Sequence, residues 1–172
     1  MVEPTVTAVP GRQPFETFVS ERSPRLLQLA WLICRDQEDA RDAVQDALVA
    51  LYPRWSRLPE GDGFEAYLYR TVVNACLRVI RRRPRALLVA DPERLRSTPA
   101  APDAGDEVST ADEVWTLCGE LPPSQRAAVV LRFQRDLSFA EIARILGCRE
   151  ATARSHVHRA TATLRSRLEA RA

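Results

Sequence analysis

Lysine is absent from this chain, histidine occurs only twice, and the single methionine is the first residue. All 25 strongly basic side chains are therefore arginine, which we attribute mainly to genome composition, although arginine also suits contacts with phosphate and guanine. The net charge is only +2, so the total charge says little about binding partners. Binding partners must therefore be inferred from how the charges are distributed along the chain.

Cysteine is scarce too, and its spacing argues against a metal centre. The four cysteines lie far apart and form no Cys-x-x-Cys pair, and the two histidines, His156 and His158, are not at metal-ligand spacing from any cysteine in sequence. We therefore expect no zinc site, no other metal and no cofactor. The cysteines are interpreted as small core residues in a reducing compartment: Cys34, Cys76, Cys118 and Cys148.

Several other features are missing, and each excludes a class of protein. The N-terminus has no basic region followed by an apolar run, and no apolar stretch approaches the roughly 18 residues of a membrane span. We expect a cytoplasmic protein with no membrane contact of its own. No nucleophile elbow, phosphate-binding glycine loop or histidine–carboxylate pair is visible, so we do not expect an enzyme.

What the chain does contain is a helix-turn-helix pattern over residues 137–164. Ser138 precedes Glu141 at the spacing of a capping box, which starts a helix, and Gly147 supplies the left-handed residue that ends it. The apolar stripe of the second helix consists of Ala153, Val157, Ala160 and Leu164.

The opposite face of that second helix carries polar and basic side chains. Ser155, His158 and Arg159 point away from the stripe, with Arg154 and Arg165 on its flank. Arginine that reads guanine, beside small residues that allow close approach, suits the major groove of DNA. An ordinary solvated helix with scattered arginines is the alternative.

The first half of the chain is predicted to form helices with opposite charges. After a tail of residues 1–14, residues 15–34 are helical, and Pro24 either begins a new segment or kinks a continuous helix. Asp36 can cap the next helix, which runs to about Trp55. Its outer face is acidic and either is solvated or docks a basic partner: Asp39, Asp42, Gln45 and Asp46.

A basic helix follows the loop of residues 56–63. Residues 64–83 have a helical period, and this helix ends in a run of arginines, with tyrosines interleaved. Aromatic rings along a positive track suit single-stranded nucleic acid, although a basic amphipathic helix packed by its aromatics is the alternative. The candidate nucleic-acid contacts on this helix are Tyr67, Tyr69, Arg70, Asn74, Arg78, Arg81 and Arg82.

The predicted fold class is all-α, with two small helical domains joined by a flexible linker. The domains cover residues 15–85 and 111–172, and residues 86–110 form the linker because they are rich in Pro, Ala and Asp. In the second domain, residues 111–121 form a short helix, and Ser124 is expected to cap the helix of residues 125–135.

Taken in order, these segments resemble an extracytoplasmic-function sigma factor of bacterial RNA polymerase, most of all the actinobacterial sigma-E group. The stretches that carry the resemblance are FETFVSERSPRLLQLAWLI, DQEDARDAVQDALVALYPRW, FEAYLYRTVVNACLRVIRRR and LPPSQRAAVVLRFQRDLSFAEIARILGCREATARSHVHRATATLR. Departures from the family pattern at Arg149, Ala151 and His156 leave the upstream promoter sequence open, and the departure at Arg41 bears on docking to polymerase.

The resemblance implies a promoter-specificity subunit with three surfaces. Asp39, Asp42, Gln45, Asp46 and Leu48 would dock on core polymerase. The unpaired strand of the minus-ten element would contact Tyr67, Arg70, Asn74, Arg78, Arg81 and Arg82. The duplex minus-thirty-five element would contact Arg149, Arg154, Ser155, His158 and Arg159. An anti-sigma factor as a further partner, and a stand-alone helix-turn-helix regulator as the alternative function, both stay open.

Overall fold

Helices make up the regular structure of residues 13–59, 61–82 and 110–171, the parts of the chain that the computed structural model describes. The predicted linker apart from Thr110, which begins a helix, and most of the predicted tail lie outside these residues. The helical structure of the described residues agrees with the all-α prediction. The elements are α1 (Phe15–Cys34), α2 (Gln37–Leu51), the 3-10 helix η1 (Tyr52–Arg57), α3 (Asp62–Arg82), α4 (Thr110–Cys118), α5 (Pro123–Gln134), α6 (Phe139–Leu146) and α7 (Glu150–Glu169).

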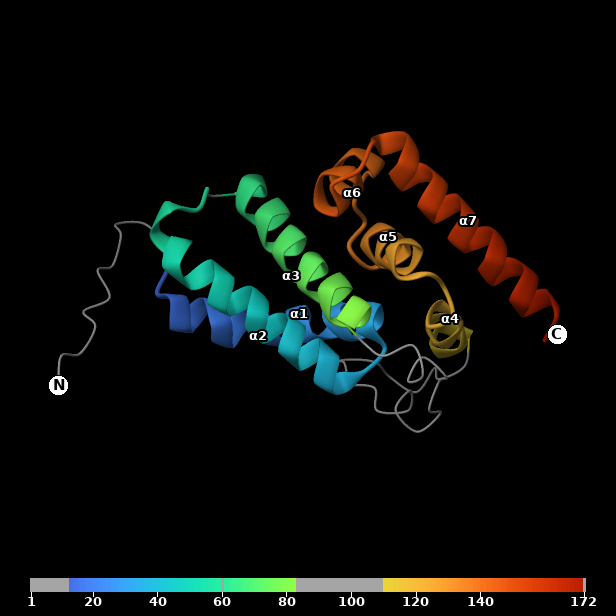
Figure 1. Ribbon diagram of the computed structural model, residues 1–172, viewed down its shortest axis with the longest axis horizontal. Coiled ribbons are helices and arrows are strands. Elements are labelled where there is room, and N and C mark those ends of the chain that lie inside the picture. Colours follow the sequence, from blue (N-terminus) through green and yellow to red (C-terminus); the bar gives the residue numbers. More distant parts are fainter. Residues whose placement is uncertain (1–12, 60, 83–109, 172) are drawn as a thin grey trace.

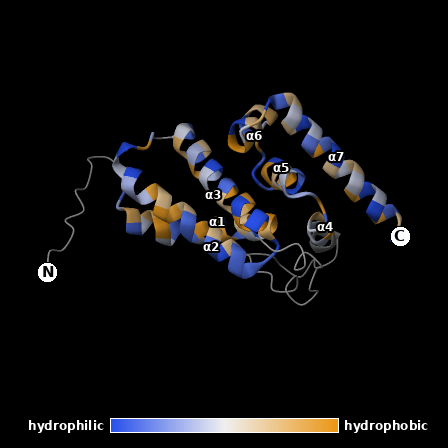
Figure 2. Cartoon of the chain, viewed as in Figure 1, coloured by the Kyte–Doolittle hydropathy of each residue, from blue (hydrophilic) through white to orange (hydrophobic). Residues whose placement is uncertain are grey.

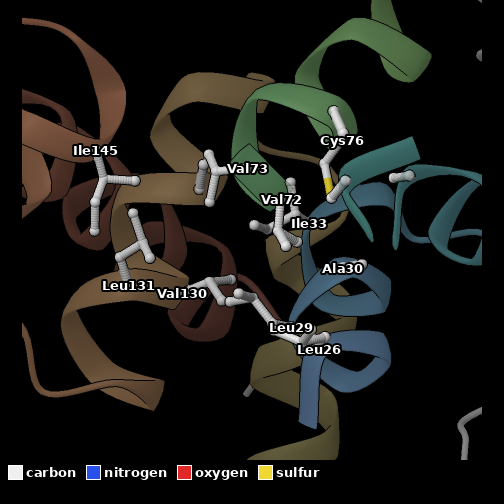
Figure 3. Close-up of a cluster of buried hydrophobic side chains, with 14 of the residues drawn as sticks. Leu26, Leu29, Ala30, Ile33, Val72, Val73, Cys76, Val130, Leu131 and Ile145 are labelled. Carbon is white, nitrogen blue, oxygen red and sulfur yellow. The ribbon is translucent and has the colours of Figure 1, made fainter. Parts of the chain in front are cut away.

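The helices form two groups that pack against each other. Figure 1 shows α1, α2 and α3 on one side and α4 to α7 on the other, with α7 on the outer side of the second group. One hydrophobic cluster runs through both groups. In Figure 3, Val130 and Leu131 of α5 lie between Leu29 of α1 and Ile145 of α6. The two predicted domains therefore share a core, which the sequence pattern alone did not indicate.

Helix α1 is continuous through Pro24, so this proline does not begin a separate helix. Its second half is buried on all sides, from Leu29 to Cys34. A helix that is apolar around its whole circumference needs neighbours on every side. Helices α2 and α3 cover it from the first group and α5 covers it from the second.

The C-terminus of α1 is completed by a residue from the second group. Arg35 ends the helix in the left-handed conformation, with φ of 56°, and its guanidinium lies 4.0 Å from the centre of the Trp31 ring. The last carbonyls of a helix have no partner within it, and α1 has no basic residue in its last turn. Arg126 of α5 donates to the carbonyls of Ile33 at 2.7 Å and Leu121 at 3.1 Å. This arginine is buried and links the two groups.

Helix α2 begins as predicted and ends earlier than predicted. The Asp36 side chain accepts a hydrogen bond from the Asp39 backbone N–H at 3.0 Å. The helix stops at Leu51, and the chain continues as η1, because Pro53 lacks the N–H that an α-helix requires. The predicted end near Trp55 was wrong for the α-helix. Trp55 packs instead on Phe18, with ring centroids 4.7 Å apart.

Helix α3 is buried on two sides. Leu68, Val72 and Ala75 face the first group, as the sequence pattern predicts. Val73 and Ile80, which that pattern did not single out, are also buried because α6 packs against α3. The basic helix of the sequence analysis is therefore held between the two groups, with only part of its circumference exposed.

In the second group, the predicted start of α5 was wrong and the predicted start of α6 was correct. Pro122 is the N-cap residue of α5 and Pro123 its first residue, so Ser124 does not cap this helix. Proline is favoured there because its missing N–H would have no helical partner anyway. Helix α6 has the predicted capping box between Ser138 and Glu141. It also ends as predicted, at Gly147 with φ of 65°.

Replacing Ser138 with alanine is expected to lower the free energy of unfolding by about 1 kcal/mol at neutral pH. The Ser138 hydroxyl accepts from the Glu141 N–H at 3.3 Å and donates to the Glu141 carboxylate at 2.6 Å. The bond that the Ser138 hydroxyl donates to the carboxylate, and the one that the Ser138 backbone N–H donates to it at 2.8 Å, hold the pKa of Glu141 below its ordinary value. The stabilisation is present above the unfolded-state pKa and lost as the pH falls through the folded-state pKa. Urea unfolding at neutral and acidic pH measures both effects.

The matched control is Ser166→Ala on α7, where the serine is exposed within a helix and caps nothing. Its free energy of unfolding should stay within about 0.5 kcal/mol of the parent protein. An equal loss in the two variants would show that the capping box contributes nothing particular to this fold.

Candidate nucleic-acid interface

The outward face of α7 has the arrangement that the sequence predicts. Ala153, Val157, Ala160 and Leu164 are buried and hold the helix against α5 and α6. On the other side His158 and Arg159 are exposed and Ser155 is half-buried. In Figure 2, hydrophilic residues recur along α7 to its C-terminal end.

The first turn of α7 is also basic. Arg149 is the N-cap residue, is exposed and makes no capping hydrogen bond with its side chain. Arg154, also exposed, is held by two contacts. Its Nη2 donates to Glu150 Oε1 at 3.0 Å, and its guanidinium carbon lies 4.5 Å from the centre of the Phe139 ring of α6. The N-terminal end of α7 therefore presents two guanidinium groups. That of Arg154 is fixed by its contacts with Glu150 and Phe139, whereas that of Arg149 makes no capping hydrogen bond.

A second basic face lies on α3. Arg70, Asn74, Arg78 and Arg81 recur at steps of three or four residues, so they share one side of the helix, and all are exposed. Arg82, in the last turn, is exposed as well. The structure thus brings most of the predicted minus-ten residues together on one face.

Tyr67 lies at the N-terminal end of that face, and its side chain is half-buried. Its hydroxyl accepts a hydrogen bond from Arg54 Nη1 of η1 at 2.9 Å. Sequence reasoning missed Arg54 because it was assigned to the end of the preceding helix. The only signal was its place beside the loop that leads into α3. Arg54 adds a further guanidinium to the basic face.

The acidic face of α2 contains the predicted docking residues. Asp42, Gln45 and Asp46 are exposed, whereas Asp39 and Leu48 are half-buried. Asp46 also contacts the basic face, since its Oδ2 lies 3.7 Å from Arg78 Nη1 and both side chains are about half exposed, at 49%. The acidic and basic surfaces of the first group therefore adjoin.

An apolar groove of about 560 Å³ lies between α1 and α2 beside this acidic face. Two of its apolar side chains are exposed beyond what a stable core requires: Val49 at 66% and Tyr52 at 46%. Leu48 and Gln45, both predicted docking residues, line the same groove. The sequence pattern treated α2 as acidic outside and apolar inside, and it missed this third, exposed apolar side.

The four cysteines lie in or against the hydrophobic clusters. Cys34, Cys76 and Cys118 are buried as free thiols and Cys148 is half-buried. A hydrogen bond with Cys76, and then burial, raise the pKa of Cys34, and burial raises the pKa of Cys118 to about 11. Within residues 13–59, 61–82 and 110–171, no group of His, Cys, Asp and Glu side chains could hold a metal ion. No helix in those ranges is long and apolar enough to cross a membrane.

Comparison with known proteins gives matches along most of the chain. Residues 18–86 match the family model of Sigma-70 region 2, and residues 111–164 match that of Sigma-70, region 4. The chain is 37% identical over 162 residues to the RNA polymerase sigma-E factor of Streptomyces avermitilis, a match that covers 91% of this chain and 86% of that protein. It is 35% identical over 161 residues to the ECF RNA polymerase sigma factor SigM of Mycobacterium tuberculosis, covering 89% and 76%.

A solved structure has a similar fold. It is the sigma factor RpoE of Bartonella quintana in complex with the anti-sigma factor NepR. The TM-score is 0.68 at 24% identity, and the match covers 90% of this chain and 96% of that chain.

Proposed function

Because the chain belongs to the sigma-70 family, as a sigma factor of the extracytoplasmic-function type, we propose that its three exposed surfaces divide the work of starting transcription. As a sigma factor it directs core RNA polymerase to promoters and initiates transcription there. Membership of this family argues against the alternative function considered from the sequence, a stand-alone helix-turn-helix regulator. The assignment of residues to each surface is what the proposal adds.

Helix α2 docks on core polymerase through the acidic face and the groove beside it. The acidic residues supply charge complementarity to a basic partner, which speeds association and fixes orientation. The apolar groove supplies the area whose removal from water stabilises the complex. The proposed docking residues are Asp39, Asp42, Gln45, Asp46 and Leu48.

The basic face of α3 holds the unpaired strand of the minus-ten element. Arginines along one side of the helix follow the phosphates, and an aromatic ring at its start offers a stacking surface for a base. Arg54 keeps the Tyr67 ring in place through its hydrogen bond to the hydroxyl. The proposed contact residues are Tyr67, Arg70, Asn74, Arg78, Arg81 and Arg82.

The outward face of α7 reads the duplex minus-thirty-five element in the major groove. It is the second helix of a helix-turn-helix, the helix that enters the groove in that motif. With the apolar stripe buried, the polar face is turned outward, with His158 and Arg159 exposed and Ser155 half-buried. The proposed contact residues are Arg149, Arg154, Ser155, His158 and Arg159.

The partners of this chain follow from the same assignment. They are bacterial core RNA polymerase and promoter DNA, both duplex and single-stranded, and the protein acts in the cytoplasm beside them without a catalytic activity of its own. An anti-sigma factor is a further partner, supported by the similar fold of a sigma factor solved with such an inhibitor.

The observation that carries the proposal is that one acidic and two basic surfaces lie on three different helices, within the segments that match the two sigma-70 regions. Run-off transcription with purified core polymerase and a panel of genomic fragments tests it. Promoter-dependent transcripts should require this chain. Tight binding of the chain alone to palindromic duplex DNA, without any such transcript, would contradict the proposal.

Arg159→Ala is expected to reduce discrimination between good and altered upstream elements by about 1–3 kcal/mol, because arginine bonds two acceptors of guanine at once. Transcription by the reconstituted holoenzyme from a set of single-base promoter variants measures this change. Arg171→Ala, at the far end of the chain, serves as the control. An equal loss at every upstream sequence would instead identify Arg159 as a phosphate contact.

A further inference from the structure

A carboxylate lies within the row of side chains that we assign to DNA on α7. Glu150, Arg154 and His158 follow one another at steps of four residues, so they share one face of the helix, and all three are exposed. DNA phosphates repel a carboxylate, and each phosphate contact otherwise adds to affinity. An acid in this place lowers the affinity of the surface for DNA of any sequence.

The contacts of Glu150 indicate what the acid does there. Its carboxylate accepts a hydrogen bond from the Arg154 guanidinium at 3.0 Å, and the ring of Phe139 lies under the same guanidinium at 4.5 Å. The two contacts come from different helices, since Glu150 belongs to α7 and Phe139 begins α6. Phe139 is itself partly buried against the hydrophobic cluster. Together they hold the arginine in one place before DNA arrives.

A held arginine recognises a base better than a mobile one. Guanidinium carries five N–H donors, and the bond to Glu150 uses one of them. Paired contacts with O6 and N7 of guanine need two donors in a fixed orientation. An arginine that is already ordered loses less side-chain entropy when it makes those contacts, which is the effect of preorganisation.

We infer that Glu150 is a positioning residue that, with Phe139, orients Arg154 toward a guanine of the upstream promoter element, lowering affinity for DNA in general and raising dependence on sequence. This inference rests on the proposed function of α7. The competing explanation is that Glu150 only stabilises the start of α7, where no side chain provides an N-cap and a first-turn acid is favourable. That explanation predicts equal effects at all DNA sequences.

The test uses the full chain in holoenzyme with core polymerase, and a promoter library randomised across the upstream element, at one salt concentration. Glu150→Gln removes the charge and keeps the size of the side chain. Arg154→Ala removes the reader, and a double variant combines both. Glu169→Gln, exposed at the other end of α7, is the matched control. Each promoter variant carries an identifying tag in its transcribed region, so sequencing the transcripts gives the base preference at every upstream position.

The expected result is specific to one position. The parent protein prefers guanine there, Arg154→Ala abolishes that preference, and Glu150→Gln reduces it by about tenfold while preferences elsewhere stay the same. Binding of the Glu150→Gln holoenzyme to promoters with poor upstream elements rises, because a repulsive charge is gone. The double variant loses no more than Arg154→Ala alone, which shows that the glutamate acts through the arginine.

Other outcomes overturn the inference. An unchanged guanine preference in Glu150→Gln, or a loss of equal size at every sequence, reduces Glu150 to a helix-start residue. A guanine preference that survives Arg154→Ala would show that Arg154 is not the residue that recognises the guanine. If the parent holoenzyme transcribes from promoters but shows no base preference at any upstream position, the assignment of α7 to DNA fails with it. If no promoter-dependent transcript forms at all, the proposed function has failed first.

Discussion

Arg126→Met is expected to lower the free energy of unfolding by about 3 kcal/mol, because two hydrogen bonds from a charged donor to buried carbonyls are lost together. Those carbonyls belong to Ile33, at the end of α1, and to Leu121, just before α5. Methionine fills similar space but cannot donate, so the Ile33 carbonyl loses this donor at the negative end of the α1 dipole, and the Leu121 carbonyl before α5 loses its donor as well. Urea unfolding followed by circular dichroism measures the loss.

Two further variants separate this effect from a simple change of charge. Arg126→Lys can reach only one carbonyl at a time, so its loss should be intermediate between the parent and the methionine variant. Arg165→Met, exposed on α7, removes the same kind of charge and should change stability by less than about 0.5 kcal/mol. Equal stability of Arg126→Met and Arg165→Met would mean that Arg126 does not tie the two groups of helices together.

Asp46→Arg is expected to weaken binding to core polymerase by a factor of ten or more, whatever the promoter. A reversed charge replaces attraction to a basic partner with repulsion. Like charges that face each other across an interface weaken binding by several kcal/mol. The side chain is half exposed on α2, beside the groove that we assign to the same partner. Titration of core polymerase with fluorescently labelled protein, without DNA, measures the affinity directly.

The contact between Asp46 and Arg78 calls for its own control. Arg78→Ala removes the cation that lies 3.7 Å from the carboxylate and leaves the acidic face intact, so core affinity should be unchanged. Glu169→Arg reverses an exposed charge at the other end of the molecule and should also have no effect. Unchanged core affinity in Asp46→Arg would remove Asp46 from the docking surface. A loss of affinity in Arg78→Ala equal to that in Asp46→Arg would trace the effect to the ion pair.

Local signals in the sequence predicted individual helices well. Ser138 with Glu141, Asp36 and Gly147 each act within a few residues of their own position, and all three do what their type and spacing predict. Periodicity also predicted the buried stripe of α7. The errors were local too: Pro53 and Pro123 moved helix ends that the apolar pattern had placed elsewhere.

The candidate surfaces were predictable to a similar degree. The grouping of the basic residues on one face of α3 and of the polar residues on one face of α7 follows from helical spacing, which decides which residues share a side. The held state of Arg154 was predictable only in part. Its spacing from Glu150 is that of a favourable acid–base pair on a helix, whereas Phe139 comes from another helix.

The sequence by itself determined which segments are helical, where most of them start, and which charges gather on each helix. Tertiary structure alone decided that α3 is buried on two sides, that a groove opens beside the acidic face, and that Arg126 completes a helix 93 positions away in sequence. The reason is one of range. Caps and helical spacing act within about four residues, whereas the partners that meet across a packed core have no fixed separation along the chain.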